Sequence, residues 1–342
     1  MNQLTEIIKR DASDVAGKID FKELDNKTIL ITGASGLLGT YFLATLQEFR
    51  SKGIAVKIVA SGKTPFPKEL HDLVKNVKFI SGDLTNPEII SSLPKADYII
   101  HAAGYGQPGK FMENPAKTIA LNTTCTIELF KKLKPGGKFL FVSSSEVYSG
   151  LPKPPYKETE IGTTNTDHPR SCYIEGKRCG EAVVNTYRAV GVLGKSARLS
   201  LAYGPGTKSG DARVLNSFIY RGIVEKKISL ADHGEAKRTY CYVTDAVEIM
   251  WHILFDGTDA IYNVGGNSKT TIGKLAKKIG SYLHVPVEFP KTEAGAQKGA
   301  PADVSLDMSK AKKQFAKTKY VSLDEGLGKT IEWQKALYLN TK

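Results

Sequence analysis

The sequence has few cysteines and no long apolar run, and both absences narrow the class of protein. Its four cysteines, Cys125, Cys172, Cys179 and Cys241, form no CxxC pair and have no histidines nearby at metal-ligand spacing, so neither a disulfide framework nor a metal site is expected. No window approaches the ~18 uninterrupted apolar residues of a membrane span, and the first residues lack the apolar stretch of a secretory signal. We therefore expect reduced thiols and a cytoplasmic protein that does not enter a membrane.

Acidic residues are outnumbered by basic ones. The sequence has 48 Lys and Arg against 35 Asp and Glu, a formal net charge of +13 that attracts polyanions such as phosphorylated metabolites or nucleic acid. The densest basic run, Lys310 to Lys319, alternates with Ala and Phe, which is typical of a solvated helix face. We expect such a face there, and no nucleic-acid partner.

The alternation of apolar runs predicts the fold. From Thr28, short β-branched runs alternate with longer amphipathic stretches, and the short runs lack period-two alternation, as in a parallel sheet covered by helices on both faces. We predict strands at 28–32, 56–60, 77–81, 98–102 and 138–143, helices at 37–50 and 119–132, and a turn at 135–137. The predicted fold class is α/β, a Rossmann-type doubly wound, mostly parallel sheet.

The 342 residues suggest one large domain or two closely joined ones. We expect a docked helix within 1–27, with contact to a partner as the alternative, and a dinucleotide-binding domain at 28–203. A smaller mixed α/β substrate domain would cover 204–342, with a segment near 240–265 returning to the first domain. Within it, helical patterns cover 211–226, 244–255, 272–283 and 323–339.

A glycine-rich turn follows the first predicted strand and opens a helix. Its residues are Gly33, Ala34, Ser35, Gly36, Leu37, Leu38 and Gly39. Glycines there permit a tight turn, close approach of the backbone to a pyrophosphate, and close packing of helix on strand. The preceding strand and following helix supply the context that the motif requires, so we predict a dinucleotide site.

The spacing GxxGxxG resembles the extended short-chain dehydrogenase/reductases that act on nucleotide sugars. Further matches to that family follow in order along the chain. The resemblance implies cofactor contacts at Ser35, Leu37 and Leu38, and at Asp83, Leu84, Ala102, Ala103 and Asn122. NAD is the implied cofactor.

The end of the second predicted strand departs from the usual NAD pattern. An acid there normally binds the ribose 2′-OH, but this chain has Ser61 and Lys63. These two side chains could instead hold a 2′-phosphate, so NADP is the alternative cofactor.

Tyr173 and Lys177 lie four residues apart, which places them on one face of a helix. A phenol has a pKa near ~10, and an adjacent ammonium favours the phenolate, so Tyr173 could act as a base toward a sugar hydroxyl. At the end of the fifth predicted strand, Ser144 occupies the position whose hydroxyl, in the family, hydrogen-bonds the reacting group.

The residues after Ser144 distinguish between reactions. Family 4,6-dehydratases carry an Asp-Glu pair, whereas here Ser145 replaces the Asp and Glu146 remains. This arrangement, with the stretches around Tyr173, Arg213 and Arg238, resembles the UDP-glucuronate decarboxylases.

The resemblance implies a role for each of these residues. Glu146 would position the sugar, Arg238 would lie where C5 is reprotonated, and Arg213 and Arg238 could bind diphosphate. Lys177 would lower the pKa of Tyr173 and hold the nicotinamide ribose. Ser145 and Lys110 are predicted substrate contacts, Lys110 to the glucuronate carboxylate. No metal is expected.

The implied activity is decarboxylation of a nucleotide sugar through transient oxidation at C4, by a homodimer that binds a UDP-linked substrate. A 4-epimerase or 4,6-dehydratase is the alternative on the same scaffold. A dinucleotide-sensing binding protein without turnover is the alternative of another class, although such a sensor has no need of Tyr173 and Lys177.

Overall fold

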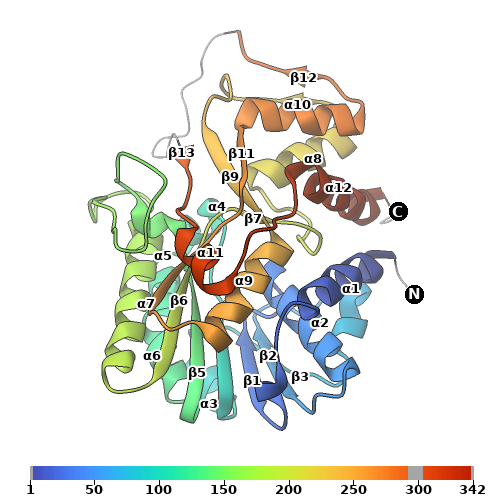
Figure 1. Ribbon diagram of the computed structural model, residues 1–342. Coiled ribbons are helices and arrows are strands. Elements are labelled where there is room, and N and C mark those ends of the chain that lie inside the picture. Colours follow the sequence, from blue (N-terminus) through green and yellow to red (C-terminus); the bar gives the residue numbers. More distant parts are fainter. Residues whose placement is uncertain (1–2, 292–302, 340–342) are drawn as a thin grey trace.

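The computed structural model describes residues 3–291 and 303–339 (Figure 1). Its largest sheet has seven strands in the order β10-β6-β5-β4-β1-β2-β3, paired in parallel throughout. The strands are β1 (Thr28–Thr32), β2 (Lys57–Gly62), β3 (Lys78–Ser81), β4 (Ala96–His101), β5 (Leu133–Ser144), β6 (Leu193–Leu199) and β10 (Ile261–Val264). The strand order reverses beside β1, which confirms the predicted doubly wound fold and places a crevice at the carboxyl ends of β1 and β4.

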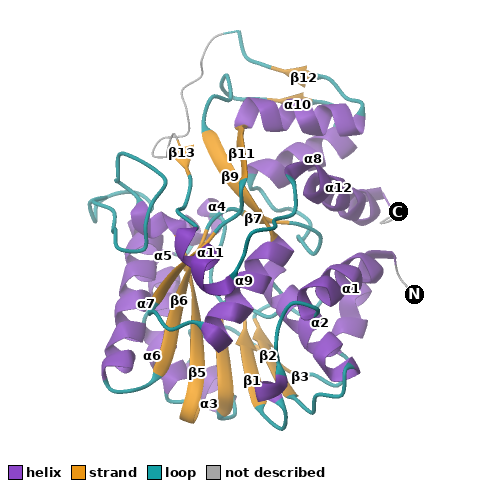
Figure 2. Ribbon diagram, in the orientation of Figure 1, coloured by secondary structure: helices purple, strands orange, loops and turns teal. Residues whose placement is uncertain are grey.

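Helices cover both faces of this sheet (Figure 2). Alternate residues of β1 enter different cores, Ile29 and Ile31 on one face and Leu30 on the other. The first face packs against α2 (Leu37–Ser51) and α9 (Val243–Asp256). The second face packs against α3 (Pro87–Ser92), α5 (Pro115–Asn122), α6 (Thr124–Phe130) and α7 (Ser171–Ala189). Burial on both sides explains why the strands are apolar without alternation.

The predicted strands differ from the observed ones mainly at their ends, but two predictions need correction. The single helix at 119–132 is two helices, because the backbone breaks at Thr123, where φ is −114° and ψ is −80°. Next to the break, the Asn122 amide donates to the carbonyl oxygen of Thr118, and side chains that bond the backbone in this way compete with a regular helix. The turn at 135–137 lies inside β5 as an irregularity in its pairing with β4.

A smaller lobe stands beyond the carboxyl ends of the sheet (Figure 1). Its strands are β7 (Ala202–Tyr203), β9 (Lys237–Tyr242), β11 (Ser268–Thr271) and β13 (Asp303–Val304), and the separate pair β8 (Ile228–Ser229) and β12 (Val287–Glu288). Its helices are α8 (Val214–Val224), α10 (Ile272–Leu283) and α12 (Leu323–Leu339). Between these segments α9 and β10 return to the large sheet. The domain boundaries at 28–203 and 204–342 stay a prediction.

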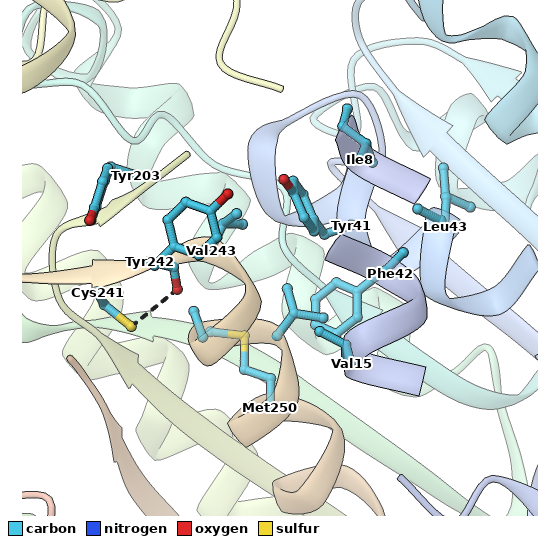
Figure 3. Close-up of a cluster of buried hydrophobic side chains, with 14 of the residues drawn as sticks. Ile8, Val15, Tyr41, Phe42, Leu43, Tyr203, Cys241, Tyr242, Val243 and Met250 are labelled. Carbon is cyan, nitrogen blue, oxygen red and sulfur yellow. Dashed lines mark hydrogen bonds between the residues drawn. The ribbon is translucent and has the colours of Figure 1, made fainter. Parts of the chain in front are cut away.

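The first helix, α1 (Gln3–Ala16), packs against α2, α9 and α12. Figure 3 shows Ile8 and Val15 of this helix in one cluster with Tyr41 of α2 and Met250 of α9. The short helices are α4 (Pro108–Glu113), α11 (Ser309–Phe315) and the 3-10 turns η1 (Lys22–Leu24), η2 (Lys68–Val74) and η3 (Ser145–Tyr148).

The basic run at 310–319 is only partly the solvated face that the sequence predicts. Lys312 and Lys313 are exposed, but Lys317 is 4% exposed because its ammonium lies between the carboxylates of Asp245 and Glu248, at 2.7 and 3.0 Å. The sequence pattern could not reveal these partners on α9.

Within residues 3–291 and 303–339, no helix is long and apolar enough to cross a membrane, and no cluster of side chains could hold a metal ion. The four cysteines are unpaired.

Candidate active site

The glycine-rich turn joins β1 to α2 at the crevice of the sheet. Gly33 has a φ of +68°, and a Cβ there would lie 2.5 Å from the carbonyl oxygen of Ala102 at the end of β4. A Cβ on Gly39 would lie 2.5 Å from the Cα of Ala34, so glycine is needed for α2 to approach β1. Gly36 caps α2, and the first turn of the helix carries neither a side-chain cap nor an acid. Its amides and helix dipole can therefore bind a diphosphate.

The ends of β2 and β3 lie beside this turn. The Ser61 side chain is 0% exposed, and its hydroxyl has no hydrogen-bond partner among the described residues. The ammonium of Lys63 is not a free cation, because it pairs with Asp83 at 3.2 Å. Lys117 pairs with the same Asp83 carboxylate at 3.1 Å. Burial raises the pKa of Asp83, but hydrogen bonds from Thr85 and the two lysines outweigh it and hold the pKa below its usual range.

Other predicted cofactor residues complete the floor of the crevice. The amide of Ala103 donates to Thr32 at 3.4 Å, whereas the Leu84 side chain is buried in the core and its carbonyl accepts a hydrogen bond from the Cys125 thiol. Asn122 lies against Gly176 of α7, and its carboxamide oxygen has no partner among the described residues. His101 is fixed between Thr32 and the carbonyl of Leu121. Burial lowers the pKa of His101 to about 4, so it is neutral at pH 7.

Tyr173 and Lys177 lie on one face of α7, at the carboxyl end of β5. The Lys177 ammonium is 5.7 Å from the centre of the Tyr173 ring and donates to the carbonyl of Val142 at 2.7 Å. The Ser144 hydroxyl lies near the Tyr173 phenol and lowers its pKa. The structure thus brings together the three residues predicted to handle the reacting hydroxyl.

The charges around these groups act in opposite directions. Burial raises the pKa of Tyr173, the Ser144 hydrogen bond and the cations Arg170 and Arg213 lower it, and Glu146 raises it, with a net upward shift. Burial lowers the pKa of Lys177 to about 7, opposed by Glu181. The negative charge of a bound dinucleotide would favour the ammonium of Lys177.

Glu146 and Arg238 lie in the same cluster. The carboxylate of Glu146 accepts a 2.6 Å ion-paired hydrogen bond from Arg170. The guanidinium of Arg238 interacts electrostatically with both Glu146 and Arg170, and burial lowers the pKa of Arg238. Arg213 is paired with Asp211 at 2.6 Å. The charges of Glu146, Arg170 and Arg213 therefore act on the phenol of Tyr173, and Arg238 interacts with two of these groups.

Two residues of this cluster escaped sequence reasoning. Phe111 stacks on the Tyr173 ring, with ring centres 4.6 Å apart and planes at 9°, and the guanidinium of Arg170 lies over the Phe111 ring at 5.8 Å from its centre. Arg170 precedes Tyr173 by three residues, within one helical turn, and this spacing was the available signal. Nothing in the sequence could place Phe111, which comes from α4.

Two predicted substrate contacts have a different environment. Lys110 is exposed on α4, and its positive charge helps to lower the pKa of Lys208. Ser145 begins η3 and is partly exposed beside Glu146. The structure leaves their predicted roles untested.

The crevice fits a dinucleotide. The turn at Gly33, Gly36 and Gly39 provides the phosphate cradle, the unpartnered hydroxyl of Ser61 and carboxamide of Asn122 provide polar atoms, and Lys177 reaches toward the open side of Gly104. A Rossmann sheet with this cradle and a Tyr-Lys pair defines an extended short-chain dehydrogenase/reductase.

The comparisons agree with this class. The sequence profile of the NAD dependent epimerase/dehydratase family matches residues 29–265, and the chain belongs to that family. This result confirms the predicted class of enzyme, and NAD is its cofactor.

The similar proteins include UDP-glucuronic acid decarboxylase 1 of Arabidopsis thaliana, 31% identical over 310 residues, which are 89% of this chain and 68% of that protein. UDP-glucuronic acid decarboxylase 1 of Danio rerio is 30% identical over 91% of this chain and 73% of its own length. Among solved structures, UDP-glucose 4-epimerase of Thermotoga maritima with UDP-glucose has a TM-score of 0.77 and 26% identity, covering 91% of this chain and 99% of that one. MoeE5 in complex with UDP-glucuronic acid and NAD has a TM-score of 0.75, 21% identity and the same coverage, and supports the fold.

Proposed function

We propose that the protein converts UDP-glucuronate to UDP-xylose and carbon dioxide, with NAD regenerated in each turnover. The observation that carries the proposal is the cluster of Tyr173, Lys177, Ser144 and Glu146 at the mouth of the dinucleotide crevice. The similarity to UDP-glucuronic acid decarboxylases along about nine tenths of the chain supports this choice of reaction.

The residues around the crevice would hold NAD. The amides of the Gly33–Gly39 turn would bind its diphosphate, Asp83 its adenosine end and Lys177 its nicotinamide ribose. When bound, NAD supplies reversible two-electron oxidation of the sugar at C4, which creates a ketone β to the C6 carboxylate.

Tyr173 moves the proton of the C4 hydroxyl. It accepts this proton during oxidation and returns it at the end of the cycle, while the Ser144 hydroxyl donates a hydrogen bond to the C4 oxygen. The stacked ring of Phe111 restricts the position of the phenol. Lys177 stabilises the phenolate through its positive charge.

Glu146 and the arginines orient the sugar around its carboxylate. Loss of carbon dioxide leaves the electron pair of the C5–C6 bond delocalised into the C4 ketone, so no carboxylic acid is needed to expel a hydroxyl. Glu146, fixed by Arg170, would hold the ring, and Arg238 would lie where C5 accepts a proton. Arg213 and Arg238 carry charge that complements the substrate diphosphate. Lys110, which is exposed on α4 beside Lys208, would contact the glucuronate carboxylate.

The test is incubation of the purified protein with UDP-glucuronate and NAD. Carbon dioxide and UDP-xylose should appear together, without net formation of NADH. The absence of both products, with the folded protein shown to bind the dinucleotide, would contradict the proposal.

A 4-epimerase is the second candidate, since the solved UDP-glucose 4-epimerase is 26% identical over 91% of this chain. Its test is interconversion of UDP-glucose and UDP-galactose under the same conditions. A 4,6-dehydratase is less consistent with the site, because Ser145 stands where a general acid for loss of water would be needed. A stable 4-keto-6-deoxy product would reveal one. A non-catalytic sensor would leave every substrate unchanged and bind DNA in a salt-sensitive manner.

We also propose a homodimer in the cytoplasm. Ile119 of α5 and Ile127 of α6 are 44% and 37% exposed beside the active-site helix α7, and a second copy could cover them. Light scattering would give the mass in solution, and cell fractionation would test the location.

A further inference from the structure

The loop that follows β7 brings an unexpected cation to the dinucleotide crevice. This loop covers residues 204–213 and is fixed from behind by α12, where the Trp333 indole donates to the carbonyl of Thr207 at 2.9 Å. Gly206 faces Leu37 in the first turn of α2, since a Cβ on Gly206 would lie 3.5 Å from the Leu37 side chain. The next side chains of the loop therefore lie at the edge of the phosphate cradle.

Lys208 reaches across this edge to two hydroxyls. Its ammonium donates to Thr64 at 2.6 Å and to Ser35 at 3.3 Å, and the two hydroxyls are themselves 3.0 Å apart. Ser35 belongs to the glycine-rich turn, whereas Thr64 follows the end of β2. Three donors from three separate segments thus converge on one point between the cradle and the ribose side of the site.

The charge at this point is positive and uncompensated. In the described part of the chain no carboxylate pairs with Lys208 or with Lys110, and burial, followed by the positive charge of Lys110, lowers the pKa of Lys208. Two cations held near each other without a counter-ion favour binding of an anion. Lys63, by contrast, is already neutralised by Asp83.

The position identifies the anion. In a dinucleotide fold the residue at the end of the second strand lies beside the adenosine ribose. An acidic residue there binds the 2′-OH of NAD, whereas a nearby basic residue accommodates the 2′-phosphate of NADP. Here Ser61 occupies that end without a carboxylate, and Ser35, Thr64 and Lys208 lie next to it.

We propose that Lys208, with the hydroxyls of Ser35 and Thr64, forms a subsite for the 2′-phosphate of NADP, so that the enzyme accepts this dinucleotide as well as NAD. Lys208 therefore determines dinucleotide specificity, a role that the sequence alone indicates for Ser61 and Lys63. The inference depends on the dinucleotide site of the family and not on the identity of the sugar.

The test is calorimetric binding of 2′,5′-ADP and 5′-AMP to the full-length protein, because these nucleotides differ by the 2′-phosphate and lack both nicotinamide and sugar. The unmodified protein should bind 2′,5′-ADP more tightly. Lys208→Ala should weaken 2′,5′-ADP by roughly 10- to 100-fold, the range expected for a lost hydrogen bond to a charged group, and change 5′-AMP little. Lys208→Arg should retain the preference.

Lys95→Ala is the matched control, because Lys95 is an exposed lysine that precedes the amino end of β4, whereas the crevice lies at the carboxyl ends of the strands. It should leave both affinities unchanged. Equal weakening of the two nucleotides by Lys208→Ala would assign Lys208 to the 5′-phosphate and overturn the proposal. Unchanged affinities, or tighter binding of 5′-AMP by the unmodified protein, would also overturn it. Failure to decarboxylate UDP-glucuronate would not affect these measurements.

Discussion

At the scale of single residues, the proposed chemistry depends on one phenol, that of Tyr173, which is surrounded by opposing charges. Burial and Glu146 favour neutral Tyr173, while Ser144, Arg170 and Arg213 favour its phenolate. Charges on bound substrate and cofactor can therefore shift the pKa of Tyr173.

Tyr173→Phe should reduce turnover at saturating UDP-glucuronate by ~10²–10⁴-fold, because it removes the proposed general base. Binding of NAD and thermal stability should change little, since phenylalanine retains the ring that stacks on Phe111. Tyr282→Phe, on the exposed surface of α10, is the control and should retain full activity. Substantial turnover by Tyr173→Phe would exclude Tyr173 as the base.

Lys177 should make folding stability depend on pH. Its pKa is about 7 in the folded protein but ~10.4 in an unfolded chain, so between these values the unfolded state binds more protons. The free energy of unfolding contributed by this group therefore rises with pH, by up to ~1.4 kcal/mol per pH unit.

Urea unfolding at pH 7, 8 and 9 checks this dependence in the protein without dinucleotide. The stability of the unmodified protein relative to Lys177→Met should increase with pH, because the variant lacks the titrating amine. Lys195, whose pKa burial lowers to about 8, is present in both proteins and cancels. A stability difference that is constant across this range would contradict the shifted pKa of Lys177.

The sequence predicted most of these residues, and the exceptions have a physical reason. Tyr173, Lys177 and Ser144 belong to local motifs, and the spacing of residues within each motif predicts where their side chains lie. Lys208 and Phe111 reach the site from segments that only tertiary packing brings close, and no local pattern encodes such a contact.

At the scale of elements, the glycine-rich turn proposed to bind the cofactor also determines how closely α2 packs on β1. Gly39→Ala would place a Cβ 2.5 Å from backbone atoms of Ala34 and Gly33, which cannot rotate away. We expect a loss of ~1–3 kcal/mol in stability, the usual cost of overpacking, and weaker binding of NAD.

Gly328→Ala is the matched control within a helix, because no atom lies within 4 Å of its added Cβ. It should leave NAD binding unchanged and stabilise α12 by up to ~1 kcal/mol, since alanine favours a helix over glycine. Thermal unfolding and calorimetry on both variants provide the comparison. Equal stability of the two variants would show that α2 can move away from β1 without cost.

The periodicity of apolar residues predicted the positions of helices and strands better than the breaks within them. The helices at 272–283 and 323–339 have the bounds that their apolar spacing indicated. The break at Thr123 and the irregularity within β5 depend on side-chain hydrogen bonds and strand pairing, which are absent from a hydrophobic pattern. The buried Lys317 was missed for the same reason, because its carboxylate partners lie more than 65 residues away along the chain.

At the scale of the whole molecule, one buried carboxylate joins segments from both ends of the chain. Asp11 of α1 accepts hydrogen bonds from Tyr41 of α2 at 3.0 Å and from Tyr242 at the end of β9 at 2.5 Å, and it pairs with Lys329 of α12 at 2.9 Å. The phenols of Tyr41 and Tyr242 lie in the cluster of Figure 3. These contacts connect the first helix, the large sheet and the smaller lobe, so we expect them to unfold together.

Asp11→Ala should therefore destabilise the entire protein rather than α1 alone. It leaves the buried hydroxyls of Tyr41 and Tyr242 without their acceptor, at a cost of ~1–3 kcal/mol for each group, while the partly exposed ammonium of Lys329 keeps its ion pair with Glu325. Asp14→Ala removes an exposed carboxylate three residues along the same helix and should cost less than ~0.5 kcal/mol. Hydrogen exchange should show faster opening in α2, β9 and α12 of the Asp11 variant, with one cooperative thermal transition at a lower temperature. If exchange increases only in α1, the carboxylate anchors that helix without coupling the two lobes.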